Sequence, residues 1–195
     1  MVNELLIDEI CKAGGHDEPL SRFMNVKMEG EIRVRELDLE NERVLDFILY
    51  DIKREFQAGT LISSTSYKGK RVKSWFSHSF PPILNPKILG LFKDNVLMGW
   101  ISFLDSISFK GRKILGFIIY KEFRNKGLGS TVLMHCWKFK SALFDNNTFE
   151  YSFRTKRSNI PMNSIARKLG MVEIEIPKEV LNSNKYIDFI LDDNP

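Results

Sequence analysis

The residues whose types and spacing suggest chemistry are 124–130, Arg-Asn-Lys-Gly-Leu-Gly-Ser. They follow an apolar run over 112–120 and open a segment with helical spacing. The first N–H groups of a helix have no intrahelical partner, and the helix dipole adds partial positive charge there. Two glycines leave that backbone open, and two cations and a serine flank it. The stretch predicts a nest for a diphosphate, although a tight turn with solubilising cations remains the alternative.

The elements that would position this turn follow from periodicity. Alternating or continuous apolar runs predict strands and 3.6-residue spacing predicts helices. The expected helices are 3–12, 40–56, 127–143 and 161–170, and the expected strands are 31–37, 112–120, 148–153, 171–176 and 186–191, with a hairpin over 87–108 around Lys93-Asp94-Asn95. Residues 58–86 are expected to form the end of a helix and a long loop. This order predicts a mixed sheet with helices in one domain.

Composition limits the class of protein. The 195 residues, 43% of them hydrophobic, suit one domain with a core, and the net charge of +4 suits an anionic ligand without requiring nucleic acid. The cysteines, Cys11 and Cys136, form no zinc or disulfide pattern, which favours a reducing compartment. We see no secretory signal and no run of about 20 apolar residues. We therefore expect a cytoplasmic protein without a membrane segment.

Two motifs together carry a resemblance. Arg124-x-x-Gly127-x-Gly129 after an apolar strand resembles the acyl-coenzyme-A-binding turn of the GNAT superfamily of N-acetyltransferases. "NIPMNSIARKLGM" resembles the second motif of the family, with Asn159 before a helix that closes at Gly170. The resemblance covers 31–195 and implies a central sheet of mixed, mostly antiparallel strands, two of them splayed apart, in a three-layer α+β fold. Residues 1–30 are expected to be an N-terminal extension of a single domain.

The resemblance also implies roles for residues. The backbone of the strand before the turn would bind the pantetheine arm of acetyl-CoA, and the N–H of Ile119 would stabilise the oxyanion. Asn159 would orient the pantetheine, with a helix N-cap as its alternative role. Arg167 or Lys168 would reach the 3′-phosphate, or is simply solvated. The residues expected to bind the cofactor are Phe117, Ile118, Ile119, Arg124, Asn125, Lys126, Gly127, Leu128, Gly129, Ser130 and Asn159.

At one position the sequence departs from the family pattern. Many relatives carry a tyrosine seven residues after the asparagine, as the acid for the leaving thiolate, but here that residue is Ala166. Water or another side chain would then serve as the acid. Glu150, an acid on a strand beside the cleft, is the candidate general base, with an ordinary surface role as its alternative. His135 is expected to be packed or exposed rather than catalytic, and a lone His78 in a loop is weak evidence for a site.

The resemblance therefore implies an N-acyltransferase that moves an acetyl group from acetyl-CoA to a primary amine in a ternary complex. A non-catalytic CoA-binding sensor or scaffold is the alternative, since Ala166 supplies no acid. A third hypothesis, binding of nucleic acid by the basic and aromatic loop 66–82, is less favoured than a solvated loop pinned to the core. We expect no metal, and a homodimer is compatible with the resemblance. The acceptor and the acyl chain length do not follow from the sequence.

Overall fold

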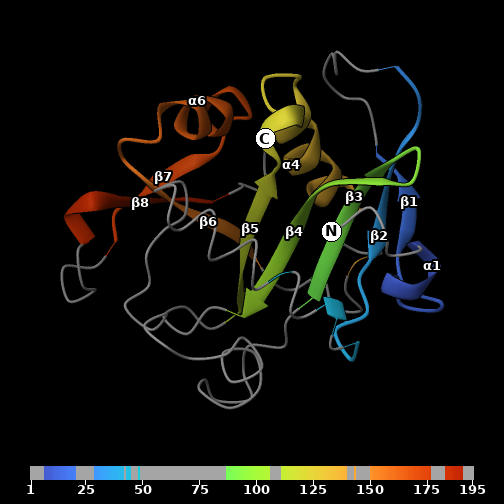
Figure 1. Cartoon of the computed structure of the whole chain (residues 1–195). Helices are drawn as coiled ribbons and strands as arrows, with labels where there is room; N and C mark the ends of the chain where they lie inside the picture. The colour runs from blue at the N-terminus through green and yellow to red at the C-terminus, as the bar shows by residue number, and fades with distance from the viewer. Residues whose placement is uncertain are drawn as a thin grey trace.

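The computed structural model describes residues 7–20, 29–41, 43–44, 48, 87–105, 111–139, 143, 150–176 and 183–190. Within these residues, strands form one sheet in the order β1-β2-β3-β4-β5-β6-β8-β7 (Figure 1). The strands are β1 Asp17–Pro19, β2 Ile32–Glu36, β3 Lys87–Lys93, β4 Val96–Asp105, β5 Arg112–Ile119, β6 Glu150–Lys156, β7 Val172–Ile174 and β8 Tyr186–Ile190. The helices are α1 Ile7–Ile10, α4 Leu128–Lys138 and α6 Ile160–Lys168, with 3-10 turns η4 Lys121–Phe123 and η5 Ser183–Lys185.

The sheet is mixed and mostly antiparallel, as the sequence predicts. Strands β5 and β6 pair in parallel, and every other neighbouring pair is antiparallel. A parallel pair needs a crossover, and α4 lies on the connection between β5 and β6. Because β5 and β6 are parallel, both run toward the same edge of the sheet. Each strand leads into a helix there, β5 into α4 and β6 into α6.

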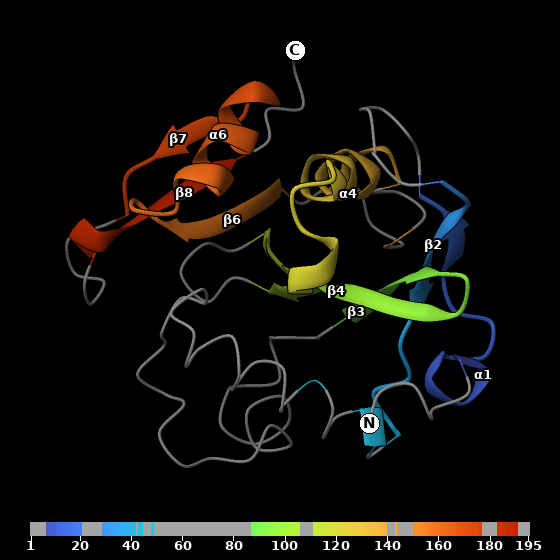
Figure 2. The ribbon, with the colours of Figure 1, turned by 45° about the horizontal axis from the view of Figure 1, so that its top comes forward.

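Helices α4 and α6 cover one face of the sheet, and α1 lies on the opposite side (Figure 2). The core is correspondingly divided into two clusters. One cluster contains Leu115, Leu128, Val132 and Phe153 under α4 and α6, and the other contains Ile10, Trp100 and Ile118. Side chains alternate between the two faces of a strand, so β5 contributes Leu115 to one cluster and Ile118 to the other. This is the expected three-layer arrangement.

The β3–β4 hairpin has a turn at Asp94-Asn95. Both residues have positive φ, 47° and 66°. A two-residue loop with positive φ at both positions suits the twist of the flanking strands, and Asp and Asn tolerate that conformation. The hairpin turn predicted at 93–95 is confirmed.

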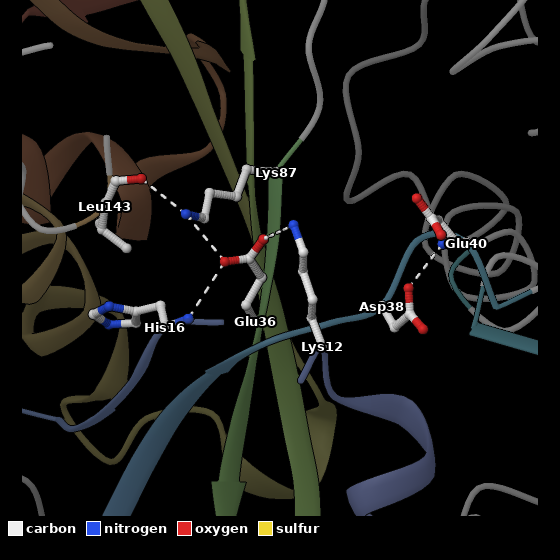
Figure 3. Close-up of polar contacts among 7 residues, drawn as sticks. All are labelled: Lys12, His16, Glu36, Asp38, Glu40, Lys87 and Leu143. Carbon is white, nitrogen blue, oxygen red and sulfur yellow. Dashed lines mark hydrogen bonds and ion pairs between the residues drawn. The ribbon is translucent and has the colours of Figure 1, made fainter. Parts of the chain in front are cut away.

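Residues 7–20 join the sheet more closely than the sequence suggests. The segment after α1, in which the sequence predicts no strand, forms β1 and pairs with β2. The carboxylate of Glu36 fastens this segment, because it contacts Lys12 Nζ (3.3 Å), Lys87 Nζ (3.0 Å) and the backbone N–H of His16 (3.3 Å) (Figure 3). Burial alone would raise the pKa of the Glu36 carboxyl, but the hydrogen bond and charge of Lys87 hold that pKa below its usual value.

Some element bounds differ from the prediction. Helix α4 ends at Lys138, five residues earlier than expected, although Leu143 is buried in the same core cluster. Strand β6 continues to Lys156, three residues further than expected, because β8 pairs with it along that length. Most of the predicted helix 40–56 and the whole predicted loop 58–86 lie outside the described residues. No helix in the described parts of the chain is long and apolar enough to cross a membrane.

Candidate functional site

The glycine-containing turn lies between η4 and the start of α4. Asn125 (φ 61°) and Gly127 (φ 83°) both adopt the left-handed conformation, and Gly127 is the N-cap of α4. As a glycine, this N-cap residue makes no side-chain capping bond. Among the described residues, the N–H groups from Asn125 to Ser130 donate to no protein acceptor. The backbone therefore presents a run of unpaired donors at a helix start, as an anion nest does.

Side chains fasten the turn to its surroundings. Arg124 Nε donates to the carbonyl of Ile119, the last residue of β5 (2.7 Å), and Thr131 Oγ1 donates to the carbonyl of Gly127 (3.1 Å). Lys126 Nζ lies over the ring of Phe123, 5.5 Å from its centroid. Arg124 and Lys126 thus add positive charge to the nest while they hold its backbone in place.

Gly129 lets α4 approach its neighbours closely. A Cβ atom at this position would lie 3.2 Å from Ile165 Cδ1 on α6 and 3.6 Å from the Phe117 ring on β5. The first contact is tighter than ordinary van der Waals packing, so a side chain here would push the two helices apart. Gly129 therefore draws the start of α4 against both α6 and β5.

Strands β5 and β6 separate beside this turn. Their pairing consists of Arg112↔Glu150, Lys113↔Tyr151 and Ile114↔Ser152. In the described residues no further pair joins them, although β5 continues to Ile119 and β6 to Lys156. The two strands therefore leave a gap in the sheet, here called the split, which opens toward the N-termini of α4 and α6. The expected splayed pair is confirmed.

Backbone hydrogen bonds at both ends of β5 show which residues face the split. At the start, the N–H of Glu150 in β6 donates to the carbonyl of Gly111 (3.0 Å). At the other end, the N–H of Tyr120 donates to the carbonyl of Met98 in β4 (2.9 Å). Backbone polar groups alternate between the two neighbours of a strand, so odd-numbered residues of β5 face β6 and even-numbered residues face β4.

This alternation shows which of Phe117, Ile118 and Ile119, the three residues of β5 expected to bind the cofactor, direct their backbone groups to the split. The N–H groups of Phe117 and Ile119 face the split beyond the last paired residues, and no acceptor in the described parts of the chain takes them. Ile118 is paired with Trp100 and directs its backbone groups to β4. Its N–H and carbonyl therefore belong to the ladder with β4 and not to the edge that faces the split.

The comparisons agree with this geometry. No protein-family model and no sequence of a curated protein matches the chain. Among solved structures, the GNAT domain of PAT from S. lividans superposes with a TM-score of 0.58 at 10% identity, covering 90% of this chain and 96% of that one. Spermidine N-acetyltransferase from Vibrio cholerae, in complex with CoA and spermine, superposes with a TM-score of 0.60 at 12% identity. The alignment covers 82% of this chain and 93% of that one. The chain has the GNAT fold.

A third match is RimL, a ribosomal L7/L12 alpha-N-protein acetyltransferase in complex with coenzyme A. Its TM-score is 0.57 at 13% identity, and the alignment covers 89% of this chain and 97% of that chain. At such low identities the likeness concerns the fold. In terms of the GNAT fold, the turn at 124–130 and the split occupy one end of the sheet, where α6 also begins.

Asn159 caps α6 in this GNAT fold. Its Oδ1 accepts from the N–H of Met162 (3.4 Å), and its own N–H donates to the carbonyl of Lys156 at the end of β6 (2.9 Å). Its N-cap role is therefore observed, whereas the ligand role remains a proposal. The two are compatible, because capping uses the oxygen of the amide and no described residue accepts from Nδ2.

Glu150 lies at the closed end of the β5–β6 pair, away from the available amides. Its carboxylate accepts from Nε and Nη2 of Arg112 (3.2 and 2.8 Å), and its side chain is 56% exposed. Its partner Arg112 is seven residues from Ile119 at the turn, a distance of about 23 Å along β5. This position argues against Glu150 as the general base, and its alternative reading as a surface residue fits.

The remaining candidates divide between the core and the surface. Ala166 is fully buried against the core, so this position supplies no proton donor. Arg167 is paired with Glu173 (2.6 Å), and Lys168 is exposed. His135 is buried beside His16 and Phe139, and burial lowers its pKa to about 4, as suits a packed, neutral imidazole. His78 and the basic loop 66–82 lie outside the described residues.

Proposed function

We propose that the protein is an N-acyltransferase that transfers an acetyl group from acetyl-CoA to a primary amine. The observation that carries the proposal is the coincidence, at one end of the sheet, of two sets of amides that donate to no described residue: those from Asn125 to Ser130 and those of Phe117 and Ile119 in β5. Two donor sets in line suit a ligand that has a diphosphate at one end and an amide-containing arm. Acetyl-CoA has both and would supply the acyl group as a thioester.

Each donor set has its own task in this proposal. The amides of the turn and the charge of Arg124 and Lys126 bind the diphosphate on the α4 side of the sheet. The arm then lies in the split like an added strand, held by backbone groups of β5 and oriented by Asn159 Nδ2. The N–H of Ile119 or Phe117 donates to the carbonyl oxygen of the thioester and stabilises the negative charge that develops there.

The amine approaches from the opposite side of the sheet, because α4 and α6 cover the side that holds the diphosphate (Figure 2). A water molecule in the split can carry its proton away, since the candidate base Glu150 is distant. The leaving thiol has a pKa of about 8.5 in its free form, so it departs without a dedicated acid. The buried Ala166 is consistent with that route.

The binding step is tested by titration calorimetry of acetyl-CoA into wild-type protein and two variants. Ser130→Glu places a carboxylate among the turn amides, and at the third helical position this residue type favours the helix itself. We expect at least about a tenfold loss of affinity, because a charged group opposes the diphosphate.

Lys138→Gln is the matched control, because it makes the same change in net charge at the exposed far end of α4. It lies eight residues, or about 12 Å, further along the helix, and we expect wild-type affinity. Absence of binding to the wild type, or equal effects of the two substitutions, would refute the proposed site.

A second candidate is a CoA-binding sensor or scaffold without catalysis. It is favoured by the lack of an acid at Ala166 and by the ion pair that occupies Glu150. The two functions differ in turnover: a transferase releases free CoA thiol when an amine is added, whereas a sensor binds acetyl-CoA and leaves it intact across a broad panel of amines.

A further inference from the structure

An ion pair lies beside the split on the side of the sheet opposite α4 and α6. Arg154 in β6 and Asp188 in β8 are register partners, with Nε to Oδ1 at 2.8 Å and Nη2 to Oδ2 at 2.9 Å. The side chain of Asp188 is 7% exposed and that of Arg154 is 25% exposed. Two parallel hydrogen bonds fix the plane of the guanidinium, and no described residue accepts from its third nitrogen, Nη1.

The position of Arg154 follows from the strand register. It is two residues beyond Ser152, the last residue of β6 that pairs with β5. Ser152 and Ile114 are paired neighbours, so Arg154 lies on the same face as Gly116, across the split from it. This is the face from which the amine approaches in the proposed function.

Across the split from Arg154, the residue of β5 on this face is Gly116. Gly116 has no side chain, and among the described residues a Cβ built there would meet one atom within 4 Å, the hydroxyl oxygen of Ser102 at 3.0 Å. That hydroxyl donates to the carbonyl of Gly116 (3.4 Å). A residue without a side chain and the Ser102 hydroxyl thus lie opposite a fixed guanidinium, close to the level of the Phe117 amide.

Charge at this end of β6 is predominantly positive. Lys156 and Arg157 follow Arg154 on the chain, and Asp188 is paired with Arg154. A positive field attracts an anionic group and lowers the pKa of a nearby amine, which favours the neutral amine that can attack. Fold stability alone gives little reason for the pair, since a buried ion pair can often be replaced by apolar residues without loss.

We propose that Arg154, oriented by Asp188, binds a carboxylate of the acceptor, so that the substrate is an amine that also carries a carboxylate, such as an amino acid or an acidic peptide. This inference rests on the proposed function and specifies the acceptor class. Arg154 then determines specificity through Nη1, while Asp188 positions it. A polycationic amine is disfavoured at the same site by like charge.

The test uses matched amines that differ in the carboxylate: γ-aminobutyrate and butylamine, and an aspartyl and an asparaginyl dipeptide that both have an amidated C-terminus, with spermidine as a polycation. Release of CoA thiol from acetyl-CoA gives kcat/KM for each. For wild-type protein we expect the carboxylate member of each pair to be preferred by about tenfold or more, the size of a hydrogen bond between charged groups.

The double variant Arg154→Met/Asp188→Leu replaces the pair by apolar residues and leaves no unpaired charge in the sheet. We expect its preference for the carboxylate member to fall to within about twofold through a higher KM, with unchanged affinity for acetyl-CoA. Arg112→Met/Glu150→Leu is the control, because it removes another ion pair at the closed end of β6, and we expect the wild-type preference there.

Three results would overturn the proposal: a wild-type preference for butylamine or spermidine, a preference retained in the Arg154→Met/Asp188→Leu variant, or no turnover of any of these amines by protein that binds acetyl-CoA. In each case acetyl-CoA binding is unaffected and the CoA site stands. Failure of wild-type protein to bind acetyl-CoA would refute the proposed function itself, and this inference with it.

Discussion

The guanidinium of Arg124 donates from Nε to the carbonyl of Ile119, 2.7 Å away. This bond joins the turn that precedes α4 to the last residue of β5. It also occupies the Ile119 carbonyl on the side of the split and leaves the Ile119 N–H available. The conformation of the turn and the backbone edge of the split are therefore coupled through one side chain.

Replacement of Arg124 tests that coupling. Arg124→Lys keeps the charge but loses the planar donor that reaches Ile119. We expect acetyl-CoA affinity to fall about tenfold, while stability to urea changes by about 1 kcal/mol or less, the usual net value of one hydrogen bond. If Arg124→Lys binds acetyl-CoA like wild type and Arg124→Gln alone loses affinity, then Arg124 contributes its charge to binding and does not position the turn.

The close approach of α4 and α6 at Gly129 predicts an energetic coupling to Ile165. Gly129→Ala places a methyl group 3.2 Å from Ile165 Cδ1 and should destabilise the fold by about 1 kcal/mol or more. Ile165→Val removes that Cδ1 atom. In the double variant we expect part of the loss to be recovered, a coupling of about 0.5 kcal/mol or more in urea unfolding. Additive effects would contradict the observed packing.

The two roles of Asn159 are separated by Asn159→Ser. Serine is a good N-cap but lacks the amide nitrogen. We expect stability within a few tenths of a kcal/mol of wild type and a several-fold weaker affinity for acetyl-CoA. Asn159→Ala, which loses the cap as well, should cost about 1 kcal/mol of stability. Unchanged affinity in Asn159→Ser would leave the cap as the sole role of this residue.

Stability should fall below neutral pH because of His135. Its pKa is lowered from 6.5 to about 4, first by burial and then by the charge of His16. The unfolded chain therefore binds a proton near pH 6.5 that the folded chain does not accept until about pH 4. The resulting stability is present above pH 6.5 and is lost as the pH falls, by up to about 3 kcal/mol.

The measurement is urea unfolding of wild type and His135→Leu between pH 7.5 and 4.5. Leucine takes up no proton in the core. The free energy of unfolding of His135→Leu should therefore fall less steeply with decreasing pH than that of wild type. His16, whose pKa is also lowered by burial, acts in the same direction and remains in both proteins. Parallel pH curves for the two proteins would show that His135 does not remain neutral in the folded state.

Much of the site could be predicted because its signals are local. The glycines after an apolar run predicted the turn, and Asn159 before Pro161 predicted a cap. The 3.6-residue spacing of 127–143 predicted a helix, and Leu128, Val132 and Cys136 of that helix lie in the core. Each of these signals depends on residues a few positions apart, whose conformations the chain itself restricts.

The rest depends on register, which a sequence pattern does not contain. Whether Ile118 or Ile119 faces the split is decided by hydrogen bonds at both ends of β5, and an apolar run is identical on its two edges. Glu150 looked suitable because it begins a strand beside the split, but its register places it at the closed end with Arg112. Arg154 and Asp188 were missed because 34 residues separate them. Arg154 also lies one residue beyond the predicted strand 148–153, so the pattern did not place it in the sheet.

The central claim is that acetyl-CoA is held by backbone N–H groups of the turn and of the split edge of β5. Amide proton–nitrogen spectra of the protein titrated with acetyl-CoA test it most directly. We predict that the signals of Phe117, Ile119 and Leu128 to Ser130 shift strongly, while those of Gly116 and Ile118, which face β4, shift little. Unchanged turn signals, or equal shifts of odd and even residues along β5, would contradict the account.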